Sequence, residues 1–158
     1  MHERAPVRCV QPPHCDDVGA KGVIDTMRVA VVQTAPIFGA KDENLQQALN
    51  MMKSVEADLY VLPELFDCGY NFTDAKEVES LADQFASGRT FEEISKFVKD
   101  AKCYAVYGFA EVDGTTYYNA SAMVGYDGMA CLYRKVHLFD RENLFFKPGN
   151  LGFRVYET

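Results

Sequence analysis

Three ionisable residues of this 158-residue chain each stand at or just after an apolar run. Glu64 follows Val61-Leu62-Pro63, Lys135 ends the run 130–134, and Glu142 lies in a polar segment seven residues further on. A carboxylate that takes up a proton and an ammonium that faces a developing oxyanion are the groups that carbonyl chemistry needs. The spacing therefore predicts a base and a cation for such chemistry, without an evident nucleophile.

Glu64 comes at the carboxyl end of a predicted buried strand, the edge at which open α/β sheets bind ligands. We expect Leu62, Leu65 and Phe66 to desolvate the Glu64 carboxylate and so raise its pKa toward that of a useful general base. The alternative is an ordinary solvated loop glutamate.

Lys135 follows a strand in which side chains alternate between two faces. The alternation places Lys135 with Cys131 and Tyr133, and puts Leu132 and Arg134 on the other face. A lysine at such a strand end is suited to stabilise an oxyanion. The alternative is a surface lysine that protects an exposed strand edge.

Glu142 is placed to orient Lys135 through a charge-assisted hydrogen bond, the alternative being a solvated charge cluster over 140–143.

His137, two residues from Lys135, is expected to pack or cap locally rather than to act as an acid or base. No cysteine is a convincing nucleophile: Cys103 is expected in the core, and Cys131 lies about 13 Å along an extended strand from Lys135.

Composition excludes several classes of protein. A net charge of −7 argues against nucleic acid or an anionic membrane as the main partner. The chain carries no apolar signal segment or membrane-length run, and its five cysteines are irregularly spaced, so we expect a reduced, cytoplasmic setting. His2, Cys9, His14 and Cys15 match no strong zinc spacing, and no metal site is expected.

From Met27 onward, strand and helix patterns alternate. The pattern predicts strands over 27–33 and 58–62, a helix from Lys41 or Asp42 to about 55, a helix capped by Thr73 or Asp74 that carries Val78 to Phe85, and a helix with a Thr90–Glu93 capping box. Strands over 104–111, 117–126 and 129–135 follow, separated by Asp-Gly turns, and 153–156 resembles the opening of another. The sheet is thus expected to be parallel early and antiparallel later.

Residues 1–26 show no sustained periodicity and contain three prolines and two glycines. Because Met27 immediately precedes the first good strand, we expect a disordered N-terminal extension over 1–26 and a single α/β domain over 27–158. The alternative is a flexible native N-terminal arm.

Four stretches, taken in order, resemble the nitrilase, or carbon–nitrogen hydrolase, superfamily. They are Arg28–Gln33, Leu62–Phe66 with Gly69-Tyr70, Tyr133–Phe139, and Glu142–Gly149. The residues of these motifs are most similar to those of its small-amidase and N-carbamoyl-amine hydrolase branches. The resemblance implies an αββα sandwich, here incomplete, with a mixed sheet and helices on one face. It also implies no cofactor, a small amide-like substrate and a homo-oligomer at full length.

The resemblance further implies a Glu–Lys–Cys triad, with Glu64 as general base, Lys135 as oxyanion cation and Glu142 as supporting glutamate. The family's cysteine follows the strand after the Pro-Gly turn, the region where this chain ends. We therefore expect the N-terminal portion of a hydrolase of non-peptide C–N bonds, inactive alone, with an exposed apolar sheet face. The alternatives are a non-catalytic small-molecule-binding module and a half-domain that a separate chain complements.

Overall fold

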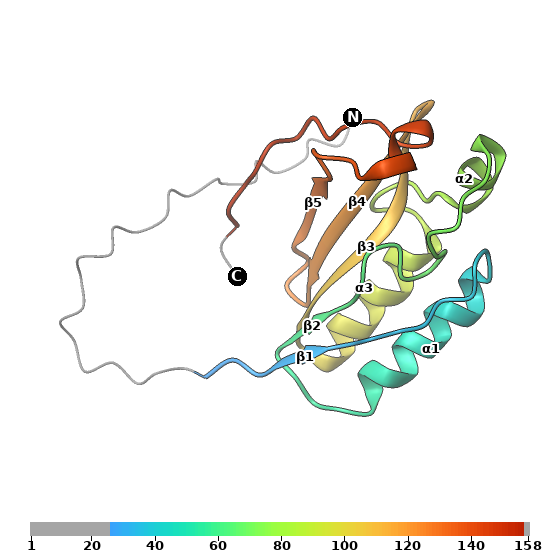
Figure 1. Cartoon of the computed structure of the whole chain (residues 1–158). Helices are drawn as coiled ribbons and strands as arrows, with labels where there is room; N and C mark the ends of the chain where they lie inside the picture. The colour runs from blue at the N-terminus through green and yellow to red at the C-terminus, as the bar shows by residue number, and fades with distance from the viewer. Residues whose placement is uncertain (1–25, 157–158) are drawn as a thin grey trace.

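The computed structural model describes residues 26–156 of the chain, so the expectation for residues 1–26 lies almost wholly outside it. Five strands form one sheet in the order β1-β2-β3-β4-β5 (Figure 1). Their bounds are β1 Val29–Val31, β2 Leu59–Val61, β3 Tyr104–Asp113, β4 Thr116–Gly125 and β5 Ala130–Arg134. Strands β1, β2 and β3 pair in parallel, and β3, β4 and β5 form an antiparallel meander, which confirms the expected mixed sheet.

Two helices of similar length, α1 (Lys41–Lys53) and α3 (Arg89–Ala101), cover one face of this sheet (Figure 1). Each presents an apolar stripe at helical spacing, so that Met52 of α1 and Ile94 and Val98 of α3 are fully buried. The main core lies between these helices and the sheet. The helices therefore pack against β2, whose carboxyl end leads into Glu64.

Neither α1 nor α3 covers the opposite face of the sheet (Figure 1). In β1 the side chain of Ala30 packs against the helix-side core, so Val29 and Val31 face the other way, and they are 53% and 79% exposed. Val31 is in register with Val61, which in turn pairs with Val106. The apolar exposure expected from the sequence is thus present on this face.

Helix α2 (Ala75–Leu81) begins as the sequence predicts, because Asp74 caps it and Glu77 completes a capping box. It ends earlier than expected, and Phe85 lies outside it. The chain leaves the helix because Asp83 makes a parallel bridge to Glu111, with the Asp83 N–H donating to the Ala110 carbonyl at 2.9 Å.

Two other local expectations were wrong. Helix α3 begins at Arg89 with Gly88 as its N-cap, and the Thr90 hydroxyl donates to the Asp67 carboxylate at 2.7 Å instead of capping its own helix. The segment 153–156 is not a strand, since none of the described strands pairs with it. Phe153 instead stacks its ring on that of Tyr133, with 5.6 Å between centroids.

Candidate active site

Lys135, the first residue after β5, places its ammonium between two carboxylates. Its Nζ donates to Oε1 of Glu64 at 2.8 Å and to Oε1 of Glu142 at 3.0 Å, and it lies 2.9 Å from Oε2 of Glu142. All three residues singled out from the sequence therefore meet in one cluster. Glu142 comes from a short 3₁₀ helix, η1 (Asp140–Leu144).

Asn119 of β4 joins the same cluster, and sequence reasoning missed it. Its side-chain amide nitrogen donates to Oε1 of Glu64 at 2.6 Å and to Oε1 of Glu142 at 2.8 Å. Both carboxylate oxygens thus receive one hydrogen bond from Asn119 and one from Lys135. The sequence did offer one sign of its role, because Asn119 is an amide residue within the largely apolar run 117–126. A polar side chain that is buried in such a strand requires hydrogen-bond partners. Asn119 is only 3% exposed.

The turn after β2 brings Glu64 to this cluster by passing very close to β3. A Cβ at Gly108 of β3 would lie 2.5 Å from the Glu64 Cα, so only glycine fits there. Backbone hydrogen bonds fix the approach on both sides: the Gly108 N–H donates to the Pro63 carbonyl at 3.1 Å, and the Phe66 N–H donates to the Gly108 carbonyl at 3.2 Å. The following residue, Leu65, adopts a left-handed φ of 48°, a strained conformation of the kind found at functional sites.

Two backbone contacts hold the lysine end of β5. The Lys135 N–H donates to the Asn119 carbonyl at 2.8 Å, and the Lys135 carbonyl accepts from the Gly149 N–H at 2.9 Å. A Cβ at Gly149 would clash with the Arg134 carbonyl oxygen, so the Pro148-Gly149 segment crosses the strand end in direct contact. Glu142 is oriented by the Phe139 N–H, which donates to its Oε2 at 2.6 Å.

The cluster keeps its charges fixed. Burial alone would lower the pKa of Lys135, but its hydrogen bonds and charge interactions with Glu64 and Glu142 more than offset this and raise it. Burial alone would raise the pKa of Glu142, but the Phe139 N–H, Lys135 and Asn119 outweigh burial and lower it. Lys135 is thus held as a cation and Glu142 as an anion near neutral pH.

The expectation that apolar neighbours desolvate the Glu64 carboxylate is wrong for the described chain. Leu62, Leu65 and Phe66 turn into the interior, with at most 5% exposure, whereas the Glu64 side chain remains 41% exposed. Glu64 turns away from these neighbours toward β4 and β5. What it gains there are two hydrogen-bond donors, Lys135 and Asn119.

Two hollows meet at the Glu64–Lys135 pair. The larger, of about 660 Å³, is rimmed by aromatic side chains and charged residues of η1; its lining includes Tyr70, Phe72, Phe139, Arg141 and Phe145. The smaller, of about 220 Å³, lies over the sheet against Gly108, Asn119, Ser121 and Tyr133. The pair is therefore accessible from two sides.

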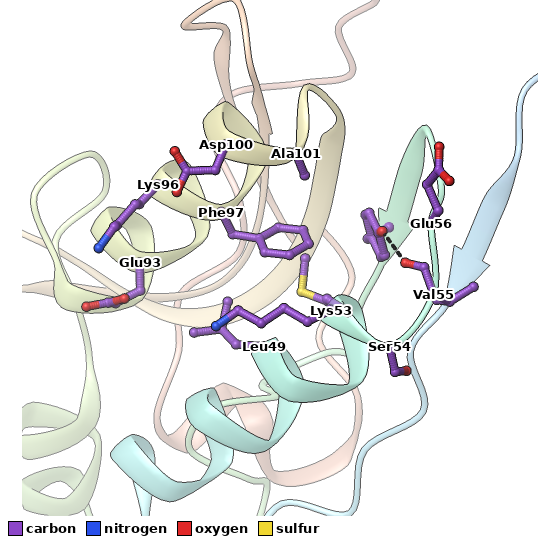
Figure 2. Close-up of a pocket in the computed structure, with 12 residues that line it drawn as sticks. Leu49, Lys53, Ser54, Val55, Glu56, Glu93, Lys96, Phe97, Asp100 and Ala101 are labelled. Carbon is purple, nitrogen blue, oxygen red and sulfur yellow. Dashed lines mark hydrogen bonds between the residues drawn. The ribbon is translucent and has the colours of Figure 1, made fainter.

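A further pocket, of about 620 Å³, lies between α1 and α3 at the other end of β2 (Figure 2). Figure 2 shows Leu49 and Lys53 of α1 facing Phe97 of α3, and the Tyr60 hydroxyl donates to the Val55 carbonyl at 2.6 Å. None of the four cluster residues lines it. It belongs to the contact between the two helices rather than to the site.

None of the cysteines within residues 26–156 is placed as a nucleophile. Cys68, Cys103 and Cys131 are all buried, with Cys68 and Cys103 at 0% and 1% exposure. Burial raises the pKa of each thiol, that of Cys103 to about 11, so the reactive thiolate is disfavoured. His137 is exposed, so it does not pack in the interior, and a local capping role stays a prediction.

The described part of the chain contains no group of three or more histidine, cysteine, aspartate or glutamate side chains arranged to hold a metal ion. None of its helices combines the length and the apolar character needed to cross a membrane.

One mixed α/β sheet thus brings together two carboxylates, a lysine and an amide, groups that are able to exchange protons and to stabilise an oxyanion. The comparisons with known proteins give the family: residues 28–158 match the carbon–nitrogen hydrolase family, and the chain belongs to it. The resemblance seen in the sequence is thereby confirmed.

Three relatives illustrate the match. A nitrilase of Pyrococcus abyssi is 42% identical over 134 residues, which cover 83% of this chain and 51% of that protein. An (R)-stereoselective amidase of a Pseudomonas species is 32% identical over 126 residues, 78% of this chain and 45% of that one. The crystal structure of an N-terminal amidase superposes with a TM-score of 0.71 at 24% identity, over 77% of this chain and 31% of that chain, which shows the fold. The chain spans about half the length of the curated relatives it matches.

Proposed function

We propose that this chain supplies the acid–base half of an enzyme that hydrolyses a non-peptide C–N bond in a small amide, N-carbamoyl amine or nitrile. Glu64 is the general base, Lys135 stabilises the oxyanion, and Glu142 positions Lys135. The enzyme requires no metal or organic cofactor. The observation that carries the proposal is the Lys135 ammonium, held at 2.8–3.0 Å between the two carboxylates beside an open hollow of about 660 Å³.

For an amide, the proposed reaction has two steps. Glu64 takes the proton of a cysteine thiol as the sulfur bonds to the carbonyl carbon, and Lys135 faces the oxygen as it becomes negative. The C–N bond then breaks, the leaving amine receives the proton from Glu64, and a thioester remains. Water adds to the thioester with Glu64 again accepting a proton, which releases the acid and restores the thiol.

We propose that the nucleophilic cysteine comes from a chain segment beyond residue 158, and that residues 1–158 alone give no covalent turnover. The burial of Cys68, Cys103 and Cys131 supports this, because a buried neutral thiol is a poor nucleophile. The smaller hollow beside Glu64 and Lys135 offers the space in which such a segment would place its sulfur. We further propose that the full-length protein is a cytoplasmic homo-oligomer.

The test compares the chain with a version extended by its downstream coding sequence, using small amides, N-carbamoyl amines and nitriles as substrates. The expected result is turnover by the extended protein only, lost on Glu64→Gln or Lys135→Ala and retained on Lys99→Ala, which removes an exposed lysine of α3. Turnover by the 158-residue chain itself, with a label from substrate on Cys68 or Cys131, would refute the assignment.

The alternative function is that of a small-molecule-binding or complementing half-domain. The hollow beside Lys135 and Glu142 favours it, because the hollow is formed within the described residues without a second chain. Stoichiometric binding of an amide or carboxylate to the 158-residue chain, lost in Lys135→Ala and without turnover in the extended protein, would support this alternative over hydrolysis.

A further inference from the structure

A second charged group lies inside the fold, on the helix side of the same turn that carries Glu64. Asp67 is 1% exposed, and its Oδ2 accepts from the Thr90 hydroxyl at 2.7 Å and lies 3.5 Å from the Lys41 ammonium. Lys41 also contacts Asp83 at 3.0 Å and donates to the Leu81 carbonyl at 2.7 Å. None of these residues lines the hollow at the candidate active site.

The partners of Asp67 come from the first turns of α1 and α3. Lys41 is the first residue of α1, Thr90 is the second of α3, and Asn44 of α1 donates its side-chain amide to the Asp67 carbonyl at 2.8 Å. Helix N-termini carry partial positive charge, so both helices favour a carboxylate at this point. The turn is therefore fastened through Asp67 to the two helices that cover the sheet.

A buried carboxylate is costly unless it is fully paired, and Asp67 is not. Its Oδ1 has no hydrogen-bond partner among the described residues. Burial raises the pKa of Asp67, while Lys41 and Thr90 act to lower it. Replacing Asp67 alone would leave the Lys41 ammonium and the Thr90 hydroxyl without this partner.

Glu64 and Asp67 stand three residues apart and are held from opposite sides. The partners of Glu64 lie on β4 and just after β5, and those of Asp67 lie on α1 and α3. Between them Leu65 is in a left-handed conformation, and the Gly69 N–H closes the turn on the Leu65 carbonyl at 2.8 Å. Rotation of this short turn would move both carboxylates together.

We propose that Asp67, held by Thr90 and Lys41, is a positioning residue that sets the direction of the Glu64 carboxylate toward Asn119 and Lys135. This inference rests on the proposed role of Glu64 as the base. A base placed an ångström away from its productive position loses much of its catalytic effect, so the buried pairing would serve the geometry of the reaction.

Asn119 provides a direct measurement, because one of its two side-chain amide protons is bonded to Glu64 and the other to Glu142. In the isotope-labelled 158-residue chain, Asp67→Asn and Thr90→Val are each expected to shift the Glu64-bonded proton upfield and to leave the Glu142-bonded proton in place. Lys99→Ala, which removes an exposed lysine in the last turn of α3, at the other end of the helix from Thr90, is the control and should shift neither.

If both Asn119 protons move together in Asp67→Asn, or if neither moves while the backbone signals of β3 and β4 remain native, the proposal is wrong. Thr90→Val decides the question by the same criterion if Asp67→Asn does not fold, because it exchanges only the hydroxyl for a methyl group of similar size. The measurement uses no substrate, so absence of C–N hydrolysis would overturn the proposed function and leave this result standing.

Discussion

Asn119 lies at the centre of the site, since it bridges the same two carboxylate oxygens that Lys135 bridges. Replacing it with alanine removes two hydrogen bonds to charged groups, each worth about 1.5–3 kcal/mol, and should lower the free energy of unfolding by about 3 kcal/mol. Asn119→Asp should cost more, because it places a third carboxylate against Glu64 and Glu142. Urea unfolding of both variants checks this, with the exposed Asn143→Ala as control. Equal stability of Asn119→Asp and the parent chain would contradict the observed network.

Glu142 makes the stability of the chain depend on pH in a defined direction. Its pKa is lowered in the folded state, so its ionised form stabilises the fold above the ordinary glutamate pKa of about 4.3. That contribution is lost as the pH falls through the lowered folded-state pKa. We therefore expect Glu142→Gln to be less stable than the parent chain by about 1–2 kcal/mol at pH 7, with the gap closing in acid.

Unfolding curves at several pH values measure this gap directly. Glu43→Gln, an exposed glutamate of α1, is the matched control and should show no comparable pH-dependent gap. A gap for Glu142→Gln that widened on acidification would have the wrong sign and would reject the assigned electrostatics.

The sequence was sufficient to select Glu64, Lys135 and Glu142, because the first two follow apolar runs and Glu142 lies in a polar segment seven residues after Lys135, each within a recognisable local motif. It was not sufficient to find Asn119 or Asp67. Their roles depend on partners on other strands and helices, such as Glu64 for Asn119 at a separation of 55 residues and Thr90 for Asp67 at 23. The sequence analysis also took Thr90 for a helix cap. The capping motif is local, and it does not show that the Thr90 hydroxyl donates to the buried Asp67 carboxylate instead.

At the scale of the elements, the contact between the β2 turn and β3 determines where the base lies. Gly108→Ala would bring a methyl group to 2.5 Å from the Glu64 Cα and 2.9 Å from the Pro63 carbonyl oxygen, both backbone atoms that cannot rotate away. We expect a loss of about 2–3 kcal/mol in unfolding free energy. In the extended protein we expect a loss of hydrolysis larger than the loss of fold explains. Ser80→Ala, at an exposed serine of α2 that lines neither hollow, is the control.

The helices and strands were largely predictable, because the spacing of apolar residues differs between the 13-residue helices and the strands that follow Lys102. The residues at which these elements end were less predictable. Helix α2 stops at Leu81 since Asp83 is recruited to β3, and 153–156 is not a strand since none of the described strands pairs with it. Both outcomes depend on tertiary partners that a local pattern does not contain.

At the scale of the whole molecule, the uncovered face of the sheet should drive self-association of the isolated chain. Val31 is 79% exposed on β1, which is an edge strand as well as part of that apolar face. Sedimentation velocity is expected to show concentration-dependent association, reduced by Val31→Lys. Val55→Lys alters a valine that is 50% exposed beside the α1–α3 pocket and should leave the association unchanged. A strictly monomeric parent chain would disprove the prediction.

The order in which the site residues meet during folding follows from their separation along the chain. Asn119, Lys135 and Glu142 are supplied by a continuous stretch, with contacts only 23 and 7 residues apart, whereas Glu64 finds its partners across 55 and 71 residues. Closing longer loops costs more entropy and slows folding. The antiparallel meander of β3, β4 and β5 should therefore form early, and Glu64, the proposed base, should reach its partners last. The contact between Glu64 and Lys135 would then form only when the whole sheet has folded.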